Sequence, residues 1–272
     1  MKTLLICHED ADLNREGLSR WLASFSDLVG VIILRDSRRR IWRQLRREIK
    51  RVGIIRFLDV AAFRVYYRLF LSKTDRLWER RKLTEIKSLY PEIRDDIPIF
   101  HTANPNTSET EQFIRKVSPD IMIARCKILL KESVFSIPAQ GTFVMHPGIC
   151  PEYRNSHGCF WALAKSDLNN VGMTLLRIDR GVDTGPVYGY YSYEVDERGE
   201  SHTIIQHRVV FDNLDALKDK LLDICAGSAR SLDISGRLSA TWGAPWLTAY
   251  LRWKWKARQR SKCGSFRSIT TM

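Results

Sequence analysis

Short apolar segments alternate with segments of helical periodicity along most of the chain. Thr3 to Cys7 is compact and apolar, Leu28 to Leu34 is rich in Val and Ile, and between them apolar residues recur at helical spacing, at Leu13, Leu18, Trp21 and Leu22. Continuous apolar segments are typical of strands that are buried on both faces. This strand, helix, strand order predicts the start of a doubly wound α/β sheet.

The same alternation returns after a long interruption. The pattern predicts further strands at 97–101, 120–126, 143–146 and 173–178, helices at 109–117 and from Phe160, and an edge hairpin arm at 187–193. After Thr203 the apolar positions follow a helical period to about Leu232. We therefore expect a Rossmann-like, mostly parallel domain over residues 1–200 and a helical C-terminal extension over 201–272.

The interruption is a segment that a minimal α/β fold does not need. Apolar residues recur at helical spacing among Arg and Lys at Ile41, Trp42, Leu45, Ile49 and Val52, and 57–71 is nearly continuously apolar. This predicts an inserted basic helical pair over about residues 38–90. Basic amphipathic helices pack on their own domain or bind an anionic surface such as a membrane, and the pattern leaves both open.

The charge is concentrated in two places. The whole chain of 272 residues carries +13, but residues 38–82 contain 16 Lys or Arg against 4 Asp or Glu, and residues 245–272 contain 7 basic residues and no acidic one. The remainder of the chain therefore carries −6. Because the rest of the chain is acidic, this distribution argues against a protein that binds nucleic acid over its whole surface. It favours an anionic partner, such as a membrane surface, that binds at the two basic segments.

Several classes of protein are not indicated. No stretch approaches 18 uninterrupted apolar residues, and the N-terminus has no signal-peptide pattern, so we expect a cytoplasmic protein, peripheral on the inner face of the membrane if the basic segments bind lipid. The six cysteines are scattered without metal-ligand spacing, which predicts neither disulfides nor a metal site. The first turn, His8 to Asp12, has no glycine-rich phosphate loop.

The candidate chemistry lies between Gly141 and Gly185. A strand ending in His146 and a later strand followed by Asp183-Thr-Gly predict an imidazole and a carboxylate at the strand ends of one crevice, where open α/β sheets bind ligands. Such a pair suits general acid–base catalysis, although both residues also fit structural roles. Cys150 is either a nucleophile paired with His146 or, as its surroundings favour, a packed thiol.

A series of short motifs resembles the folate-dependent formyltransferases. The motifs are Ser118-Pro-Asp-Ile-Met-Ile-Ala-Arg-Cys-Lys-Ile-Leu, Ile137-Pro-Ala-Gln-Gly, His146-Pro, Pro151-Glu-Tyr-Arg154, Val171-Gly-Met-Thr and Gly181-Val-Asp183-Thr-Gly. Their order and spacing over residues 119–190 are more specific than any one motif. The resemblance implies a Rossmann-like sheet that binds 10-formyltetrahydrofolate near its strand ends, and formyl transfer to a primary amine.

The resemblance also implies roles for particular residues. His146 and Asp183 match the family's catalytic His and Asp. The segments that match the folate pocket contain Cys126, Lys127, Leu129, Ile178, Asp179 and Arg180. From the residues themselves, a substrate-binding role is expected for Arg154, Asn155 and His157 in the loop after His146, and a structural role stays open for His157.

One position departs from the family pattern Asn-x-His, because Val144 stands two residues before His146. The family's Asn helps to hold the formyl oxygen, and loss of one such donor costs about 2.7 to 4 kcal/mol. The motifs favour an amino-sugar formyltransferase with an anionic, nucleotide- or lipid-linked acceptor. Val144 favours the alternative of a degenerate formyltransferase-like binding protein, and a third alternative is a formyltetrahydrofolate hydrolase. The sequence leaves the acceptor and the oligomeric state open.

Overall fold

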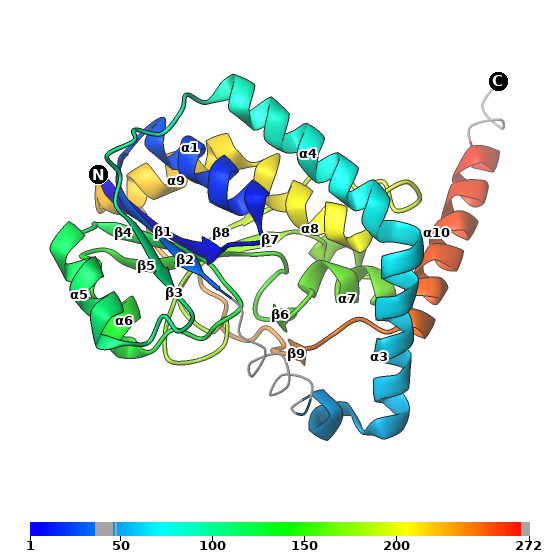
Figure 1. Ribbon diagram of the computed structural model, residues 1–272. Helices are drawn as coiled ribbons and strands as arrows, with labels where there is room; N and C mark the ends of the chain where they lie inside the picture. The colour runs from blue at the N-terminus through cyan, green and yellow to red at the C-terminus, as the bar shows by residue number, and fades with distance from the viewer. Residues whose placement is uncertain (36–45, 47, 268–272) are drawn as a thin grey trace.

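The computed structural model of the protein describes residues 1–35, 46 and 48–267, with side chains as far as Arg260. A seven-stranded sheet in the order β3-β2-β1-β4-β5-β7-β8 forms its centre (Figure 1). The strands are β1 (Lys2–His8), β2 (Asp27–Leu34), β3 (Ile99–Thr102), β4 (Ile121–Arg125), β5 (Gly141–His146), β7 (Met173–Arg177) and β8 (Val187–Tyr191). A separate two-stranded pair joins β6 (Arg154–Asn155) to β9 (Thr241–Trp242).

The sheet is mostly parallel, as the sequence predicts. β1 pairs in parallel with β2 and β4, β2 with β3, and β4 with β5, whereas β7 is antiparallel to both β5 and β8. The last residues of β1, β4 and β5, which are His8, Arg125 and His146, therefore lie along one edge of the sheet. β8 is the edge strand that the alternation at 187–193 predicts.

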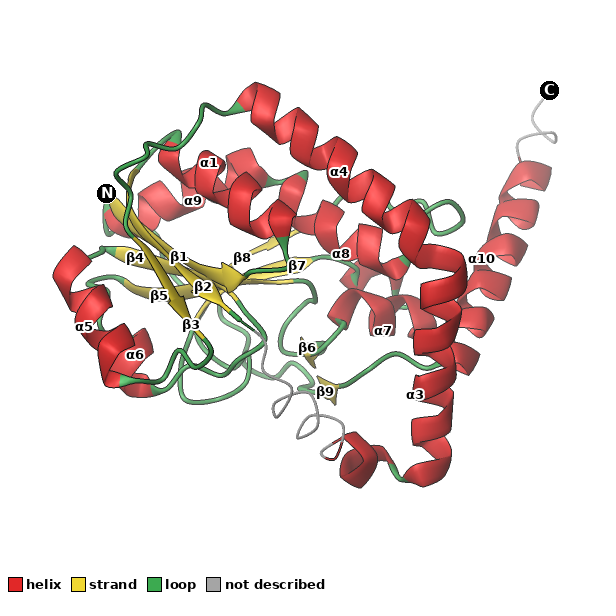
Figure 2. Ribbon diagram, in the orientation of Figure 1, coloured by secondary structure: helices red, strands yellow, loops and turns green. Residues whose placement is uncertain are grey.

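Helices cover one face of the sheet, apart from the edge strand β3, whose Ile99 and His101 are exposed (Figure 2). Apolar residues of this face form one cluster with Trp21, Phe160, Val209 and Leu217 from four different helices. The helices are α1 (Leu18–Ala23), preceded by the π-turn Leu13–Gly17, α7 (Gly158–Lys165), α8 (His202–Phe211) and α9 (Leu214–Cys225). A short 3-10 turn (Leu168–Asn170) follows α7.

The opposite face is covered in two different ways. Under β1, β2 and β4, Ile114 of α5 (Ser108–Val117) and Val134 of α6 (Glu132–Phe135) complete a second apolar cluster. Under β5, β7 and β8, the packed residues come from loops, among them Cys150 and Ile234. Loops thus surround the face of β5 to which His146 belongs.

The inserted segment forms a bent helical arm. α3 (Ile54–Tyr66), the π-turn Tyr67–Leu71 and α4 (Ser72–Leu89) run without interruption, and Gly53, at φ 79°, begins the arm after a helical stretch at 48–52. The predicted helical positions Ile41, Trp42 and Leu45 lie outside the described residues. Within the described part of the chain, no helix combines the length and the apolar character needed to cross a membrane.

The C-terminal region is helical at both of its ends. The helix expected to run to about Leu232 ends at Cys225, because Gly227 adopts φ 73°, a left-handed conformation that closes a helix C-terminus. A mainly irregular segment, 226–246, leads to α10 (Leu247–Arg267), which packs beside α3. α8 and α9 share the large cluster with the sheet, and the division of the chain at residue 200 stays a prediction.

Candidate active site

His146 is the last residue of β5, and 5% of its surface is exposed. Because side chains alternate along a strand, Val144 and His146 face the side of the sheet opposite to Phe143 and Met145. His146 Nε2 lies 2.9 Å from the backbone carbonyl oxygen of Tyr153. A carbonyl only accepts hydrogen bonds, so Nε2 carries the proton and Nδ1 is the basic nitrogen of the neutral ring.

Asp183 lies beside this basic nitrogen. Asp183 Oδ2 is 3.5 Å from His146 Nδ1 and accepts a hydrogen bond of 2.8 Å from the backbone N–H of Asn155. Both side chains are largely buried. A carboxylate in this position stabilises the imidazolium that forms when Nδ1 takes up a proton. The structure therefore brings together the two residues that the sequence singles out, and their catalytic role stays a prediction.

The route by which Asp183 reaches the site differs from the expected one. The sequence predicts that both residues follow strand ends at the same edge of the sheet, and this is wrong for Asp183. β7 runs antiparallel to β5, so its last residue, Arg177, pairs with Phe143 near the start of β5 and lies away from His146 at its end. The connection 178–186 must then return along the sheet to His146. Asp183 adopts φ 52°, in the left-handed region, where this connection turns.

Two glycines allow the loop after His146 to pack tightly against the imidazole. A Cβ on Gly148 would lie 2.5 Å from the carbonyl oxygen of Tyr153 and 2.8 Å from His146 Nε2. A Cβ on Gly158 would lie 2.5 Å from Gly148 Cα. Any larger residue would displace the carbonyl that fixes the tautomer of His146.

Arg154 and Asn155 hold the Asp183 connection in place. Arg154 Nη1 donates a 2.9 Å hydrogen bond to the carbonyl of Val182, and the Asn155 side chain donates to the carbonyl of Trp242. Arg154 Nε is buried and has no hydrogen-bond partner among the residues that the structure describes. Both residues are thus positioning residues for Asp183, and direct contact with a substrate stays a prediction for them.

His157 opens onto a cavity of about 320 Å³ next to this loop. His157 immediately precedes Gly158, which packs on Gly148 and so connects the cavity wall with the His146 loop. The cavity is lined by residues of the helical arm, of the start of α8 and of the segment before α10, namely Val60, Phe63, Arg64, Tyr67, His157, His202, Thr203, Ala244 and Pro245. Sequence reasoning found only His157 among these, because the others are distant along the chain and belong to no motif.

Burial keeps the two cavity histidines neutral. It lowers the pKa of His157 to about 4, and the nearby charges of Lys127 and Arg64 act in the same direction. Burial also holds the pKa of His202 well below its usual range. Burial raises the pKa of the Tyr67 hydroxyl to about 12. At neutral pH the cavity therefore offers uncharged hydrogen-bonding groups, with the cation of Arg64 in its wall.

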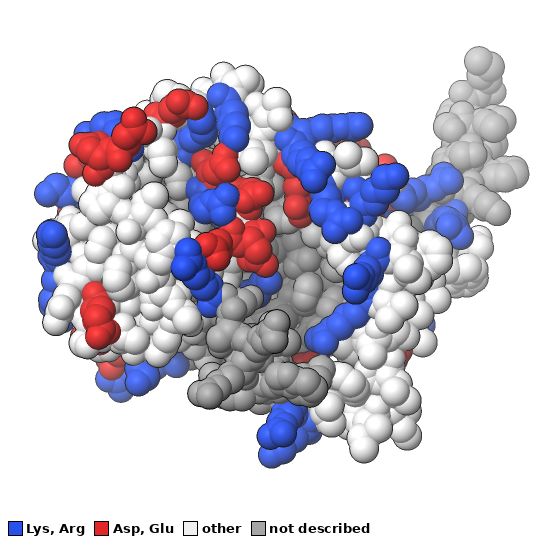
Figure 3. All heavy atoms as spheres, viewed as in Figure 1, with Lys and Arg blue, Asp and Glu red and all other residues white. Residues whose placement is uncertain are grey.

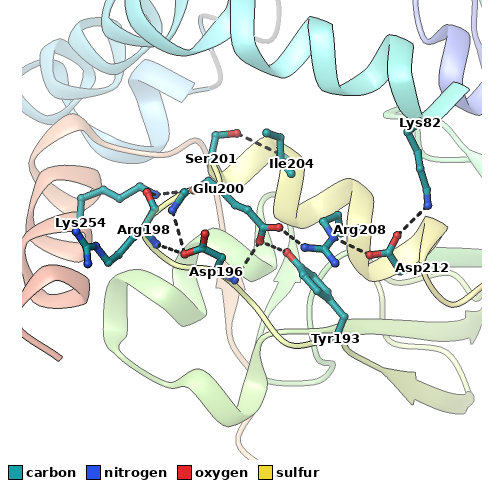
Figure 4. A network of polar contacts seen from close by, with 11 residues as sticks. Lys82, Tyr193, Asp196, Arg198, Glu200, Ser201, Ile204, Arg208, Asp212 and Lys254 are labelled. Carbon is teal, nitrogen blue, oxygen red and sulfur yellow. Dashed lines mark hydrogen bonds and ion pairs between the residues drawn. The ribbon is translucent and has the colours of Figure 1, made fainter. Parts of the chain in front are cut away.

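A network of polar contacts fixes the segment that leads into α8 (Figure 4). The side chain of Glu200 accepts hydrogen bonds from the Tyr193 hydroxyl, at 2.6 Å, and from Arg208, which also contacts Asp212. Lys82 of the arm reaches Asp212 at 3.1 Å.

Two further contacts extend this network to both neighbouring helices. Lys254 of α10 donates to the carbonyl of Glu197 at 2.8 Å, and the Ser201 hydroxyl donates to the buried carboxylate of Asp75 at 2.8 Å. His202, the residue after Ser201, is therefore held between α4 and α10.

The two segments expected to bind folate lie next to each other. Arg180 forms an ion pair of 2.7 Å with Glu132 of α6, just beyond the first segment. Cys126 and Ile178 pack against the apolar cluster of α5 and α6, whereas the side chains of Lys127, Leu129 and Arg180 are exposed. Asp179 is engaged locally, since its Oδ1 accepts from Gly181 and Thr184. Folate binding by these residues stays a prediction.

Val144 and Cys150 belong to an apolar floor beside His146. They pack together with Leu176 and Val187. Burial raises the pKa of the Cys150 thiol well above its usual range, which disfavours the thiolate that nucleophilic catalysis needs. Cys150 is thus a packed thiol, and Val144 supplies no hydrogen-bond donor where the family pattern has Asn.

A family model described as formyl transferase matches residues 70–221, more than half of the chain. Methionyl-tRNA formyltransferase from Kosmotoga olearia is 33% identical over 92 residues, which are 34% of this chain and 29% of that protein. The chain spans between 17% and 38% of the length of the curated relatives that it matches.

Two solved structures share the fold over most of the chain. A sugar N-formyltransferase from a Shewanella species has a TM-score of 0.53 and 13% identity, covering 89% of this chain and 77% of its own. Phosphoribosylglycinamide formyltransferase from Anaplasma phagocytophilum has a TM-score of 0.54 and 13% identity, covering 89% and 97%. At 89% of the chain, both likenesses extend beyond the residues of the family match.

Proposed function

Since this chain belongs to the formyl transferase family, we propose that it transfers a formyl group from 10-formyltetrahydrofolate to a primary amine, with His146 and Asp183 as the acid–base pair. The observation that carries the proposal is the 3.5 Å approach of Asp183 Oδ2 to His146 Nδ1, together with the carbonyl of Tyr153 that occupies Nε2. The pair is largely buried and held in place by these contacts, which suits general acid–base catalysis.

In the proposed reaction the unprotonated amine attacks the formyl carbon, and a tetrahedral intermediate forms with charge on the formyl oxygen. The amine nitrogen loses a proton to His146 Nδ1, and Asp183 stabilises the resulting imidazolium. As the bond between the formyl carbon and the folate nitrogen breaks, the proton passes to that nitrogen. The products are a formamide and tetrahydrofolate, so atoms and charges balance.

The exposed side chains of Lys127, Leu129 and Arg180 support a folate site beside this pair. Folate carries a flat ring system and a carboxylate tail. Leu129 is an exposed apolar side chain, and Lys127 and Arg180 are exposed cations, which suit those two parts. Lys127 and Arg180 come from two connections that the ion pair of Arg180 with Glu132 holds together.

We further propose an amino sugar on a nucleotide or lipid phosphate carrier as the acceptor. The cavity at His157 supports this choice, because neutral imidazoles and hydroxyls suit sugar hydroxyls, and Arg64 in the wall suits a phosphate. The names of the relatives give three different kinds of acceptor, so the relatives do not select one for this chain. The proposal of an amino sugar therefore depends on the cavity at His157.

The test is incubation with 10-formyltetrahydrofolate and a panel of amino-sugar nucleotides, followed by mass spectrometry. We expect a formylated sugar, and we expect His146→Ala to lower the rate by about a hundred- to ten-thousandfold. His101→Ala is the matched control, because His101 lies on β3, away from the site, and is exposed.

Two other outcomes would refute the proposal in different ways. Consumption of 10-formyltetrahydrofolate without a formylated sugar would identify a hydrolase with water as the acceptor. Absence of any turnover would identify a degenerate, formyltransferase-like binding protein, which the apolar Val144 favours.

A further inference from the structure

The outer side of the helical arm is apolar and open to solvent. Six large apolar side chains have between 59% and 87% of their surface exposed, namely Ile54, Ile55, Leu58, Val65, Leu69 and Phe70. Ile54, Leu58, Val65 and Leu69 follow helical spacing, so they form one stripe along α3 and the π-turn after it. We call these six residues the outer stripe.

The outer stripe is not the core-facing side of the helix. Val60 and Phe63 already bury the other side of α3 against the domain, and Tyr66 packs on Tyr250 of α10. A surface helix normally carries polar residues on its solvent side. A contiguous exposed apolar surface of this kind marks an interaction site.

Cations border the outer stripe. Arg68 comes from the arm itself, Lys73 and Arg76 follow at the start of α4, and all three are exposed. Figure 3 shows the white surface of α3 with blue side chains along its border. Asp59 is the only acidic residue between positions 54 and 71, and it is engaged by Thr248 at the start of α10.

We propose that the outer stripe docks the protein onto an anionic phospholipid bilayer. Apolar side chains enter the boundary between headgroups and acyl chains, while Lys and Arg at the same level contact the anionic headgroups. On the neighbouring α10, Leu251 and Trp255 are also exposed, and Trp favours this boundary.

The charge of the surface distinguishes a bilayer from a second copy of the chain. A two-fold symmetric dimer through the outer stripe would place the Arg and Lys border of one copy next to that of the other. Like charges at such an interface repel, whereas an anionic bilayer neutralises them.

Docking through α3 would also orient the proposed acceptor cavity. The inner side of the same helix supplies Val60, Phe63 and Arg64 to the cavity at His157. The docking proposal does not depend on catalysis, and its test is separate from that of the proposed function.

The experiment is flotation of the full chain with phosphatidylcholine vesicles that contain or lack phosphatidylglycerol, at low and high salt. We expect binding to the anionic vesicles only, with loss of most binding at high salt. Ile55→Glu should weaken binding by about tenfold or more, because it places a carboxylate at the bilayer surface. Leu238→Glu is the matched control, since Leu238 and Ile55 are 85% and 87% exposed and Leu238 lies outside the arm.

Three results would overturn the proposal. They are absence of binding to anionic vesicles at low salt, equal binding by Ile55→Glu and the parent protein, and a dimer in solution that Ile55→Glu converts to a monomer. Formyl transfer to a soluble amine, assayed in parallel, should be the same for Ile55→Glu as for the parent protein. A failure of docking is therefore distinguishable from a failure of the proposed function.

Discussion

At the scale of single residues, the site depends on which nitrogen of His146 is free. The carbonyl of Tyr153 engages Nε2, so Nδ1 faces Asp183 and the space where a substrate amine would react. Val144 lies on the same face of β5, two residues earlier, in an apolar floor. Both residues of the proposed acid–base pair are therefore in contact, whereas position 144 supplies no donor for the formyl oxygen of the proposed reaction.

We expect Val144→Asn to raise kcat/KM for formyl transfer by about tenfold or more. One well-placed amide donor to a developing oxyanion is worth about a hundred- to a thousandfold, and part of that gain is lost by burying an amide among Leu176 and Val187. Steady-state kinetics with 10-formyltetrahydrofolate measures the effect, and Val144→Ala controls for the change of volume. A fall in activity would show that the site has been rebuilt around the valine.

At the scale of elements, close backbone contacts hold the His146 loop in register. Gly148 and Gly158 allow the loop and the start of α7 to touch. Trp161, in the middle of α7, connects this helix with two later segments, because it stacks on Trp242 of β9 at 5.0 Å and contacts Trp246 before α10.

Gly148→Ala should lower both stability and activity. The new methyl group would overlap the Tyr153 carbonyl and His146 Nε2, so the loop must move. We expect a loss of about 2 kcal/mol or more in the free energy of unfolding, measured by denaturant titration. Gly236→Ala is a control for a glycine with open space around its Cα, although its own φ of 77° makes a modest loss expected there.

Asp59→Ala should loosen α10 from the arm. The carboxylate of Asp59 on α3 accepts hydrogen bonds from the backbone N–H and the hydroxyl of Thr248, in the first turn of α10. Loss of a side chain that caps a helix start costs about 1 kcal/mol. Hydrogen exchange should become faster in the first turns of α10 and stay unchanged in α9; unchanged exchange in α10 would contradict the assignment of Asp59 as its cap.

At the scale of the whole molecule, one sheet face is covered by helices and the other is divided between two helices and the loops of the site. α3 of the arm and α10 lie together at one side of the domain, whereas α4 crosses over α1 and α8 (Figure 1). The outer stripe lies on α3 and the π-turn that follows it. The cavity between arm and domain contains the buried His202 and the partly buried His157, both neutral.

These histidines predict a loss of stability in acid. The folded-state pKa of His157 is about 4, below its unfolded value of about 6.5. Between these values the unfolded chain binds a proton that the folded protein does not, so the free energy of unfolding falls as the pH is lowered from about 6.5 to about 4, by up to about 3 kcal/mol.

Urea titrations at several pH values measure this effect. His157→Asn should flatten the dependence, and Asn tolerates the left-handed φ of 57° at this position. A slope equal to that of the parent protein would show that His157 is not responsible. His101→Asn serves as the control for an exposed histidine.

The sequence by itself determined the strand and helix order, the mostly parallel sheet, the family resemblance and the pair His146 and Asp183. These features are local: apolar periodicity reports which faces of an element are buried, and short motifs are contiguous along the chain. The departure at Val144 was visible for the same reason.

Only the tertiary structure decided which other residues these residues contact. Asp183 lies in a connection that returns along the sheet to His146, because β7 is antiparallel to β5. Arg154 and Asn155 donate hydrogen bonds that hold this connection. The tertiary structure also brought Tyr67 and His202 to the cavity at His157, and it left the apolar outer stripe of α3 exposed. Contacts between residues far apart in the chain follow from packing, and apolar periodicity alone does not tell a helix side that is buried from one that faces solvent.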